Sequence, residues 1–500
     1  MSTQITALSD QHSNDQHLKI KSLEPTSLWK HFVDLNAVPR PSKQEERVIR
    51  FAQQFGESLN LETIIDAVGN VIIRKPASPG MENRTPIVMQ SHLDMVHQKN
   101  SDIDFDFDQQ GIEMLLDDDW VKANGTTLGA DNGIGVATIM AVLSSDDIAH
   151  PAIEALFTID EETGMTGAKG LVGGLLNGKI LLNLDTEDDN ELTIGCAGGV
   201  DITATHKYLA EDTPAGSAGF KIAITGLSGG HSGMQIHEGL ANANKIMNRI
   251  LWKASSEFEL HLVEIDGGGL RNAIPRESFA TIVVNADQSD EFQAWLDSYS
   301  EMILLEYKTT DPDGKISYEL MEHPPEKIIP PKLQKYLLGT IYGVHSGIHR
   351  MSPDIRDLVQ TSNNLARVLV KDGEIQIGCL TRSSVNTERD DLANAISAVL
   401  SLSGGQVETS GDYPGWKPSP QSTIVKLMAE IYEEMFDEKP HVAACHAGLE
   451  CGIIGTNYPE MEMISFGPNI RGAHSPDERV QISSVQKFWK YLLETLKRIP

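Results

Sequence analysis

The spacing of apolar residues predicts a layered α/β region in the first 200 residues. Leu28, Phe32 and Leu35 fall on one face of a helix, and a second helix with the same spacing starts near Val48. Short apolar runs then alternate with a longer helical one. The runs "NVIIR", "TPIVMQSH", "IEALFTID" and "KILLNLD" predict strands, and "NGIGVATIMAVL" predicts a helix. Strands that alternate with helices indicate an α/β domain with a parallel or mixed sheet.

The pattern changes after about residue 198 and returns after about residue 410. Between these points, the order of strands and helices predicts an α+β unit of the form β-α-β-β-α-β. We therefore expect one domain built from both ends of the chain and interrupted by an inserted domain. The expected parts are a flexible leader at 1–22, the first part of the α/β domain at 23–198, the insert at 199–400 and the second part at 401–500.

Polar residues recur where the predicted strands of the α/β domain end. They are His92 and Asp94, Glu161 and Glu162, Asp185, and His474 in a loop after the last strand, with Asp131 in a Gly-rich turn before a helix. Singly, each has an ordinary explanation: a surface histidine, a helix N-cap, or a solvated acidic loop. Together they place two imidazoles and several carboxylates at the edge of an open sheet where ligands bind. This set predicts a site for two divalent metal ions, with Zn²⁺ favoured by the mixed nitrogen and oxygen ligands.

The adjacent glutamates of "DEETG" need separate roles in such a site. Paired ions in hydrolases lie about 3.5–4 Å apart and lower the pKa of a water toward ~7. A carboxylate that binds a metal cannot also serve as a free base, so a hydrolase needs one of each. We expect one of Glu161 and Glu162 to be a ligand and its neighbour to be the general acid/base.

The charge and composition narrow the class of protein. A net charge of −30 over 500 residues argues against nucleic acid and against anionic membranes as partners. The four cysteines form no CxxC pair and indicate reduced thiols. The N-terminus has neither the basic start nor the apolar core of a signal peptide, and no apolar stretch is long enough to span a membrane. We expect a cytoplasmic enzyme.

The motifs "SHLDMV", "TLGADNGIG", "DEETGMTGA", "LNLDTED" and "GAHSPDE", in this order, resemble the di-zinc clan of aminopeptidases, carboxypeptidases and aminoacylases. Within the clan, "HLDMVHQKN", "GGHSGMQIH", "LTRSSVN" and "ACHAGLECGI" are similar to the bacterial aminoacyl-histidine dipeptidases, also called cytosol non-specific dipeptidases. The resemblance runs from about residue 25 to the C-terminus. It implies a di-zinc catalytic domain with an inserted lid and dimerisation domain, and hence a homodimer.

The resemblance also implies a role for each matching residue. His92 and Asp185 would bind one zinc, Glu162 and His474 the other, and Asp131 would bridge both. Asp94 would orient His92, and Glu161 would be the general base. In the insert, His231 and Asn272 would lie near the carbonyl oxygen of the substrate, and Arg382 would hold its C-terminal carboxylate. For Arg382 a surface salt bridge is the alternative; Glu450 has two interpretations, a partner of the substrate amino group or a structural role at a helix start.

The implied activity is hydrolysis of dipeptides of broad specificity, including Xaa-His dipeptides such as β-alanyl-histidine. Two Zn²⁺ ions per chain are expected, with Mn²⁺ or Co²⁺ as substitutes. An N-acyl amino acid amidohydrolase of the same clan is the nearest alternative, and a non-catalytic binding protein is a third. The sequence leaves open which dipeptides are preferred, which metal is physiological, and whether His231 acts within its own subunit or across a dimer.

Overall fold

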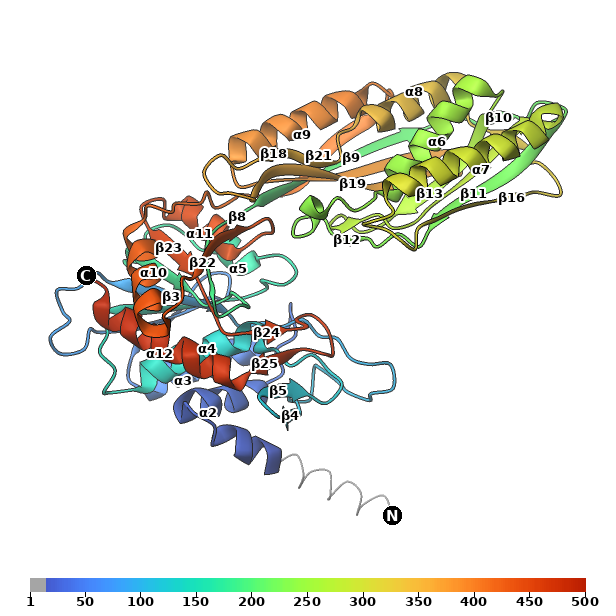
Figure 1. The fold of residues 1–500 in the computed structure, drawn as a ribbon. Helices are drawn as coiled ribbons and strands as arrows, with labels where there is room; N and C mark the ends of the chain where they lie inside the picture. The colour runs from blue at the N-terminus through green and yellow to red at the C-terminus, as the bar shows by residue number, and fades with distance from the viewer. Residues whose placement is uncertain (1–14) are drawn as a thin grey trace, which may run out of the picture. The chain divides into compact units, whose positions relative to one another are not determined.

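The computed structural model describes residues 15–500, which divide into two compact units (Figure 1). The first unit comprises Met1–Gly195, Pro418–Ala444 and Glu450–Pro500, and the second comprises Cys196–Lys417 and Cys445–Leu449. The expected flexible leader covers residues 1–22, and its first 14 residues lie outside the described part of the chain. Residues 15–21 form a helix, and Ile20 on this helix is buried in the core of the first unit.

The first unit is built on an eight-stranded sheet. Its order is β1 (Glu62–Ile65), β2 (Val71–Lys75), β6 (Ile153–Thr158), β3 (Ile87–His92), β7 (Ile180–Asn183), β23 (Glu462–Ser465), β8 (Glu191–Cys196) and β22 (His441–Cys445). The four central strands β6, β3, β7 and β23 run parallel. Every residue of β3, β6 and β7 is buried, because parallel strands are covered on both faces. The carboxyl ends of these strands therefore meet at one edge of the sheet.

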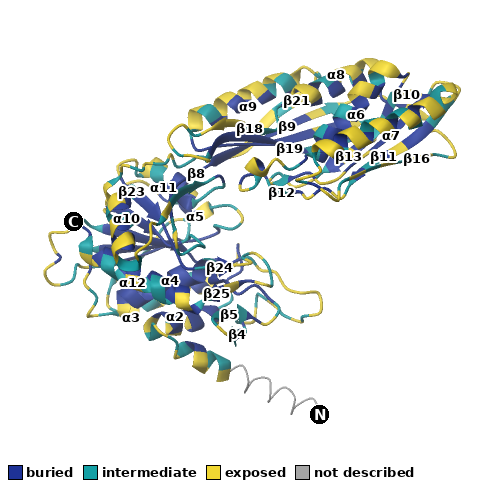
Figure 2. Cartoon of the chain, viewed as in Figure 1, coloured by how far each residue is buried: buried dark blue, intermediate teal, exposed yellow. Residues whose placement is uncertain are grey.

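The helices of the first unit are α2 (Thr26–Asn36), α3 (Glu46–Ser58), α4 (Ala130–Ser144), α5 (Thr166–Gly170), α10 (Thr423–Phe436), α11 (Glu450–Asn457) and α12 (Ile482–Arg498). A four-stranded sheet completes it, in the order β24 (Ile470–Arg471), β25 (Arg479–Gln481), β5 (Trp120–Ala123) and β4 (Met114–Asp117). Helix α4 is buried along almost its whole length and appears dark in Figure 2. Its sequence is apolar all round, as a helix in the interior must be.

The second unit has a nine-stranded antiparallel sheet. Along it run β16 (Lys315–Leu320), β11 (Ser217–Thr225), β15 (Ser278–Asn285), β13 (His261–Gly268), β19 (Val359–Lys371), β20 (Glu374–Ser383), β9 (Gly198–Lys207) and β21 (Gln406–Tyr413), with β18 (Gly347–Met351) on β19. Two short pairs, β10 (Glu211–Asp212) with β17 (Lys327–Ile328) and β12 (Gly230–His231) with β14 (Ala273–Ile274), lie beside it.

Four helices share one core with this sheet: α6 (Ala243–Glu257), α7 (Ser289–Glu306), α8 (Pro331–Gly343) and α9 (Asn386–Ser401). Their outer faces are exposed (Figure 2). The predicted β-α-β-β-α-β succession is found in β11, α6, β13, β15, α7 and β16, and β19, β20, β9 and β21 extend the same sheet. The mixed α/β fold expected from the sequence is confirmed, and the lid role of the second unit stays a prediction. Within residues 15–500, we find no helix that is both long and apolar enough to cross a membrane.

Candidate metal centre and substrate-binding residues

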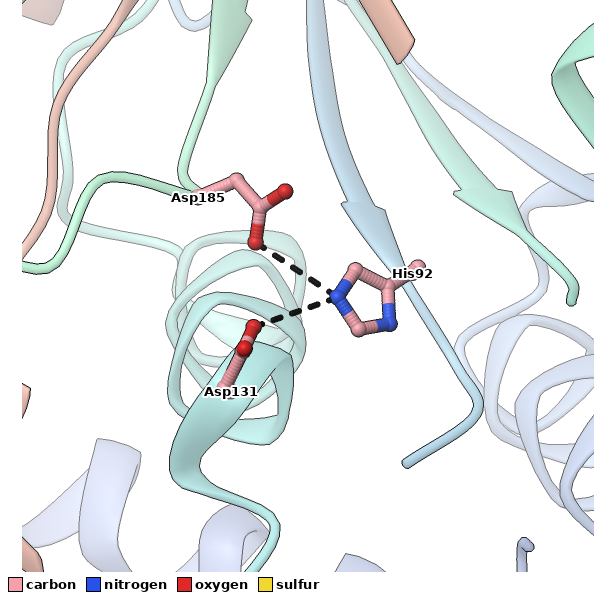
Figure 3. A group of neighbouring side chains, drawn as sticks. All are labelled: His92, Asp131 and Asp185. Atoms are coloured by element: carbon pink, nitrogen blue, oxygen red, sulfur yellow. Dashed lines mark hydrogen bonds and ion pairs between the residues drawn. The ribbon is translucent and has the colours of Figure 1, made fainter. Parts of the chain in front are cut away.

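The parallel strands of the first unit bring His92, Asp131 and Asp185 together (Figure 3). His92 is the last residue of β3, Asp185 follows β7 by two residues, and Asp131 lies in the first turn of α4. The His92 Nε2 atom is 3.3 Å from Asp131 Oδ1 and 3.5 Å from Asp185 Oδ1. These three side chains therefore offer one nitrogen and two oxygens within the reach of a single ion.

A second group is formed by Asp131, Glu162 and His474. His474 lies in the loop between β24 and β25, and Glu162 lies in the loop after β6. The His474 Nε2 atom is 3.0 Å from Glu162 Oε2 and 3.2 Å from Asp131 Oδ2. Asp131 thus turns one carboxylate oxygen to each imidazole, which is the arrangement of a carboxylate shared by two metal sites.

Asp94 lies behind these groups and is fully buried. Its Oδ1 is 3.4 Å from His92 Nδ1 and accepts a hydrogen bond of 3.0 Å from the N–H of Glu161. Its Oδ2 accepts bonds from the N–H of Glu162, at 3.3 Å, and from the Ser42 hydroxyl, at 2.8 Å. Asp94 therefore fixes the His92 ring from its far side and the backbone of the glutamate pair at the same time.

The electrostatics of the group reflect an excess of buried carboxylates. Burial and the neighbouring carboxylates raise the pKa of Glu161 well above its usual value, and burial raises that of Asp185 to about 6. Burial would also raise the pKa of Asp131, but hydrogen bonds with His474 and His92 lower it.

The pKa values of the two imidazoles are raised as well. Hydrogen bonds to Asp131 and Glu162 raise the pKa of His474 to about 11. Burial would lower the pKa of His92, but Asp185 and Asp131 raise it well above its usual value. The cluster therefore takes up protons when no other cation balances its charge.

The residues present fit divalent ions. Glu162 Oε1 is buried without a hydrogen-bond partner among residues 15–500, and buried Asp185 Oδ1 has no hydrogen bond there beyond the 3.5 Å contact with His92 Nε2. Buried carboxylate oxygens without a partner are costly unless an ion occupies the space before them. Each group has one imidazole, one carboxylate of its own and the carboxylate of Asp131, which both groups share. This combination matches the donor sets of zinc and similar metals.

Two buried side chains that the sequence analysis did not single out hold the turn that carries Asp131. Glu478 accepts hydrogen bonds from four successive backbone N–H groups, of Leu128 (2.7 Å), Gly129 (2.9 Å), Ala130 (2.7 Å) and Asp131 (3.1 Å). Arg40 donates to the carbonyls of Gly129, at 2.6 Å, and Asp94, at 3.0 Å. The only signal in the sequence was the presence of Glu478 in the motif "GAHSPDE".

The remaining predicted residues lie in the second unit, where β12 carries His231. The His231 Nδ1 atom accepts bonds from the N–H groups of Gly233 (3.2 Å) and Met234 (2.9 Å), so in the neutral ring the proton is on Nε2. Burial, followed by the charge of Arg382, lowers the pKa of His231 to about 4. His231 and Asn272 line one open hollow of about 630 Å³, and Asn272 is exposed there. His231 is thus a neutral hydrogen-bond donor.

Arg382 is a buried residue of β20, with 5% of its surface exposed, which excludes the alternative of a surface salt bridge. Its guanidinium donates to the Tyr413 hydroxyl at 2.8 Å, whereas its Nε finds no acceptor in the described part of the chain. A positive charge buried without a carboxylate partner is the feature expected of a site for an anion.

His446 is a further polar residue near Arg382 that the sequence analysis did not include in its candidate set. Its Nε2 is 2.8 Å from the Ser362 hydroxyl, and its buried Nδ1 has no partner among the described residues. Burial, followed by the charges of Arg382 and His231, lowers the pKa of His446 to about 3. The segment of five residues that carries His446, Cys445–Leu449, belongs to the second unit although both its flanks belong to the first.

Comparison with known proteins gives a consistent result along nearly the whole chain. Residues 88–498 match the model of peptidase family M20/M25/M40. The cytosol non-specific dipeptidase of Escherichia coli (strain K12) is 41% identical over 482 residues, which cover 96% of this chain and 99% of that protein. The crystal structure of aminoacylhistidine dipeptidase from Vibrio alginolyticus has a TM-score of 0.90 at 42% identity and covers 96% of this chain and 98% of its own.

A more distant structure shares the fold alone. Aminopeptidase PepT from Bacillus cereus has a TM-score of 0.55 at 15% identity, over 95% of this chain and 99% of its own.

Proposed function

Because the chain belongs to peptidase family M20/M25/M40, we propose that it is a metal-dependent dipeptidase of broad specificity, acting on Xaa-His dipeptides such as β-alanyl-histidine among others. The two similar proteins with more than 40% identity are both named as dipeptidases. The observation that carries the proposal is Asp131, which turns one oxygen toward His92 and the other toward His474. The alternative of an N-acyl amino acid amidohydrolase is not favoured by these relatives.

Two zinc ions per chain would be held by the two groups, with Mn²⁺ or Co²⁺ as substitutes. His92 and Asp185 would bind one ion, Glu162 and His474 the other, and Asp131 both. When bound, such ions activate a water molecule and polarise the carbonyl of the scissile bond. Asp94 would keep the His92 ring in the tautomer that presents Nε2, since His92 Nδ1 faces Asp94.

Glu161 would take a proton from the attacking water and deliver it to the leaving nitrogen. Its raised pKa and its half-buried position beside the ligands support this role, because a base that must also act as an acid works best near neutral pH. The carboxylate of Glu161 lies in one group with His92 and Glu162. The two glutamates are therefore close enough for one to bind a metal ion and the other to act as the base. The contact of Glu162 with His474 favours Glu162 as the ligand and leaves Glu161 as the base.

His231, Asn272 and Arg382 would bind the substrate. The Nε2–H of neutral His231 can donate to the oxyanion that forms at the carbonyl, and the Asn272 amide would assist it. Arg382 has an unpaired Nε and would hold the C-terminal carboxylate of the dipeptide.

The experiment that tests this function compares hydrolysis of a panel of dipeptides, including β-alanyl-histidine, with hydrolysis of N-acyl amino acids. Wild type and Glu161→Gln are assayed together, with the bound metal quantified in both. We expect hydrolysis of dipeptides by wild type, and a variant that keeps about two metals per chain but loses nearly all turnover. Loss of metal in the variant would reverse or merge the roles of Glu161 and Glu162. Cleavage of N-acyl amino acids alone would overturn the dipeptidase assignment.

A homodimer through the second unit and a cytosolic location complete the proposal. Trp252 on α6 and Tyr336 and Tyr342 on α8 are large apolar side chains with between 41% and 51% of their surface exposed. Trp252 and Tyr342 also touch, with ring centroids 5.7 Å apart, and so form a patch of the kind found at interfaces. The cytosolic location follows the name of the Escherichia coli relative. Light scattering of wild type and Trp252→Glu would test the dimer.

A further inference from the structure

Glu450 is a buried carboxyl group that the proposed mechanism does not use. It is the first residue of α11, and none of its surface is exposed. Its Oε2 accepts hydrogen bonds of 2.6 Å from Gln90 Nε2 and of 2.6 Å from the Thr158 hydroxyl. A side chain enclosed in this way has no surface to offer a substrate amino group, so of the two interpretations left by the sequence only a role inside the protein stands.

The partners of Glu450 lie directly behind the candidate metal centre. Gln90 precedes His92 by two residues on β3, and Thr158 is the last residue of β6, three residues before Glu161. The two strands are parallel neighbours, and His92 pairs with Thr158 in their register. Asn183, the last residue of β7, donates to Gln90 Oε1 at 2.5 Å. One hydrogen-bond network therefore joins the ends of the three strands that lead into His92, Glu161 and Asp185.

The surroundings of Glu450 favour its neutral form. The donors to its Oε2, Gln90 and Thr158, are uncharged, and its Oε1 has no hydrogen-bond partner among residues 15–500. The charged groups that face it are His92 and Asp94 from the end of β3, Asp185 from β7, and Glu161 from the loop after β6. Burial raises the pKa of Glu450 to about 8. A neutral carboxyl group can accept both bonds on Oε2 and carry its proton on Oε1.

We propose that Glu450 is a positioning residue for the hydrolytic reaction: by accepting hydrogen bonds from Gln90 and Thr158 it ties the carboxyl ends of β3 and β6 together and so fixes the spacing between His92 and Glu161. The inference rests on the proposed function, because it takes His92 as a ligand and Glu161 as the base. It assigns Glu450 no contact with substrate or metal. Groups that orient metal ligands from behind typically contribute 10- to 100-fold to metal affinity or activity.

The test compares Glu450→Gln with Glu450→Ala in the full chain. Glutamine keeps a carbonyl oxygen for Gln90 and Thr158 and places an amide where the protonated oxygen stands, so we expect kcat within about 3-fold of wild type. Alanine removes the acceptor, and we expect kcat to fall by about 10- to 100-fold, with KM changed by less than about 3-fold. Zn²⁺ affinity of the metal-stripped proteins, measured by competition with a chelating dye, should fall by a similar factor for alanine and not for glutamine.

Two further variants separate positioning from general loss of stability. Thr158→Val removes the hydroxyl that donates to Glu450 and accepts from Gln90 Nε2 at 3.1 Å, with little change of volume, and it should lower kcat in the same direction even if Glu450→Ala does not fold. Glu154→Gln is the matched control. Glu154 is a buried carboxylate at the other end of β6 and accepts hydrogen bonds from Arg74 at 3.0 Å and the N–H of Asn177 at 2.6 Å. We expect this control to lower the melting temperature with kcat and Zn²⁺ affinity unchanged.

Three results would overturn the inference. The first is wild-type kcat and Zn²⁺ affinity in both Glu450→Ala and Thr158→Val. The second is Glu450→Gln as impaired as Glu450→Ala, which would mean that a charge is needed. The third is an equal loss of kcat in Glu154→Gln. Failure of the proposed function is distinguishable, because wild type would then leave every dipeptide intact while the Zn²⁺ affinities of the variants still report on Glu450.

Discussion

The two units of the molecule carry polar groups of opposite kinds. The candidate centre of the first unit gathers carboxylates, among them Asp131, Glu162 and Asp185, and its buried oxygens lack donors. The candidate site of the second unit gathers donors, His231, Arg382 and His446, with buried nitrogens that lack acceptors. The pKa values differ accordingly: those of His92 and His474 at the first site are raised, and those of His231 and His446 at the second are lowered. Histidine is thus placed to bind cations at the site of the first unit and anionic oxygens at the site of the second.

The contrast has a simple physical origin. At the candidate centre of the first unit, carboxylates are in the majority, so His92 and His474 hold a proton more tightly. In the second, burial acts on imidazoles whose charged neighbour is a guanidinium, so they lose it. A cation should therefore complete the first site, and the oxygen atoms of a substrate should complete the second.

The largest effect is expected from removing the carboxylate shared by both groups of the first unit. Asp131→Asn removes the one carboxylate charge that both imidazoles contact, and we expect loss of both metals and a fall in kcat of at least about 10³-fold. Metal content by mass spectrometry and dipeptide turnover check this. Asp117→Asn, at an exposed strand end of the same unit, is the control and should behave as wild type. A variant that binds two metals normally would break the assignment of Asp131.

A smaller effect, in the second unit, is expected from His231→Ala. Loss of one preorganised donor to an oxyanion typically lowers kcat by about 10²- to 10³-fold. Because His231 belongs to the other kind of site, the metal content should stay as in wild type. His237→Ala, six residues away, serves as the comparison. A fall in bound metal together with kcat would contradict the assignment of His231 to substrate binding alone.

Arg382→Met should act on binding of the substrate carboxylate. We expect kcat/KM for dipeptides to fall by about 10²-fold, since a buried charged hydrogen bond contributes about 2–5 kcal/mol. Dipeptide amides, which lack the carboxylate, should be hydrolysed by wild type and variant at similar low rates. Kinetics on the two substrate series measure the difference, and equal losses on both series would contradict carboxylate recognition.

The smallest effect is a slope of stability with pH caused by His446. Its pKa falls from 6.5 in the unfolded chain to about 3 in the folded one, so below pH 6.5 the unfolded state binds a proton that the folded state does not. Stability should therefore drop as pH falls, by about 2 kcal/mol from pH 7 to pH 5 for this group.

Urea unfolding of wild type and His446→Gln at both pH values checks this slope. The variant should lose less stability between pH 7 and pH 5 than wild type, whatever its absolute stability. Identical slopes in the two proteins would mean that His446 is protonated in the folded chain.

The strands that carry the candidate centre could be predicted because they are buried on both faces. Their sequences are continuous apolar runs, and the polar residues that follow mark where each strand leaves the sheet. Helix α4 was recognisable for the same reason. The roles within the centre came from the resemblance to a family, since spacing alone gives no means of telling Glu161 from Glu162.

The long-range contacts of the supporting residues could not be predicted from the sequence. Glu478 is 347 residues from Asp131 along the chain, and Glu450 is 360 residues from Gln90. Such contacts depend on how distant elements pack, which local patterns do not record. Likewise, nothing in the spacing around β19 to β21 indicated that these strands extend the same sheet as β11 and β15.

The segment Cys445–Leu449 has a consequence for attempts to treat the two units as interchangeable modules. The backbone passes from one unit to the other at four places, after Gly195, Lys417, Ala444 and Leu449, rather than at the two of a simple insertion. Excision of residues 196–417 alone would remove Ser362, the hydrogen-bond partner of His446. It would also remove the N–H of Ala197, which donates to the carbonyls of Cys445 and Ala447. A chimera between relatives must therefore exchange residues 445–449 together with 196–417 to keep a matched pair.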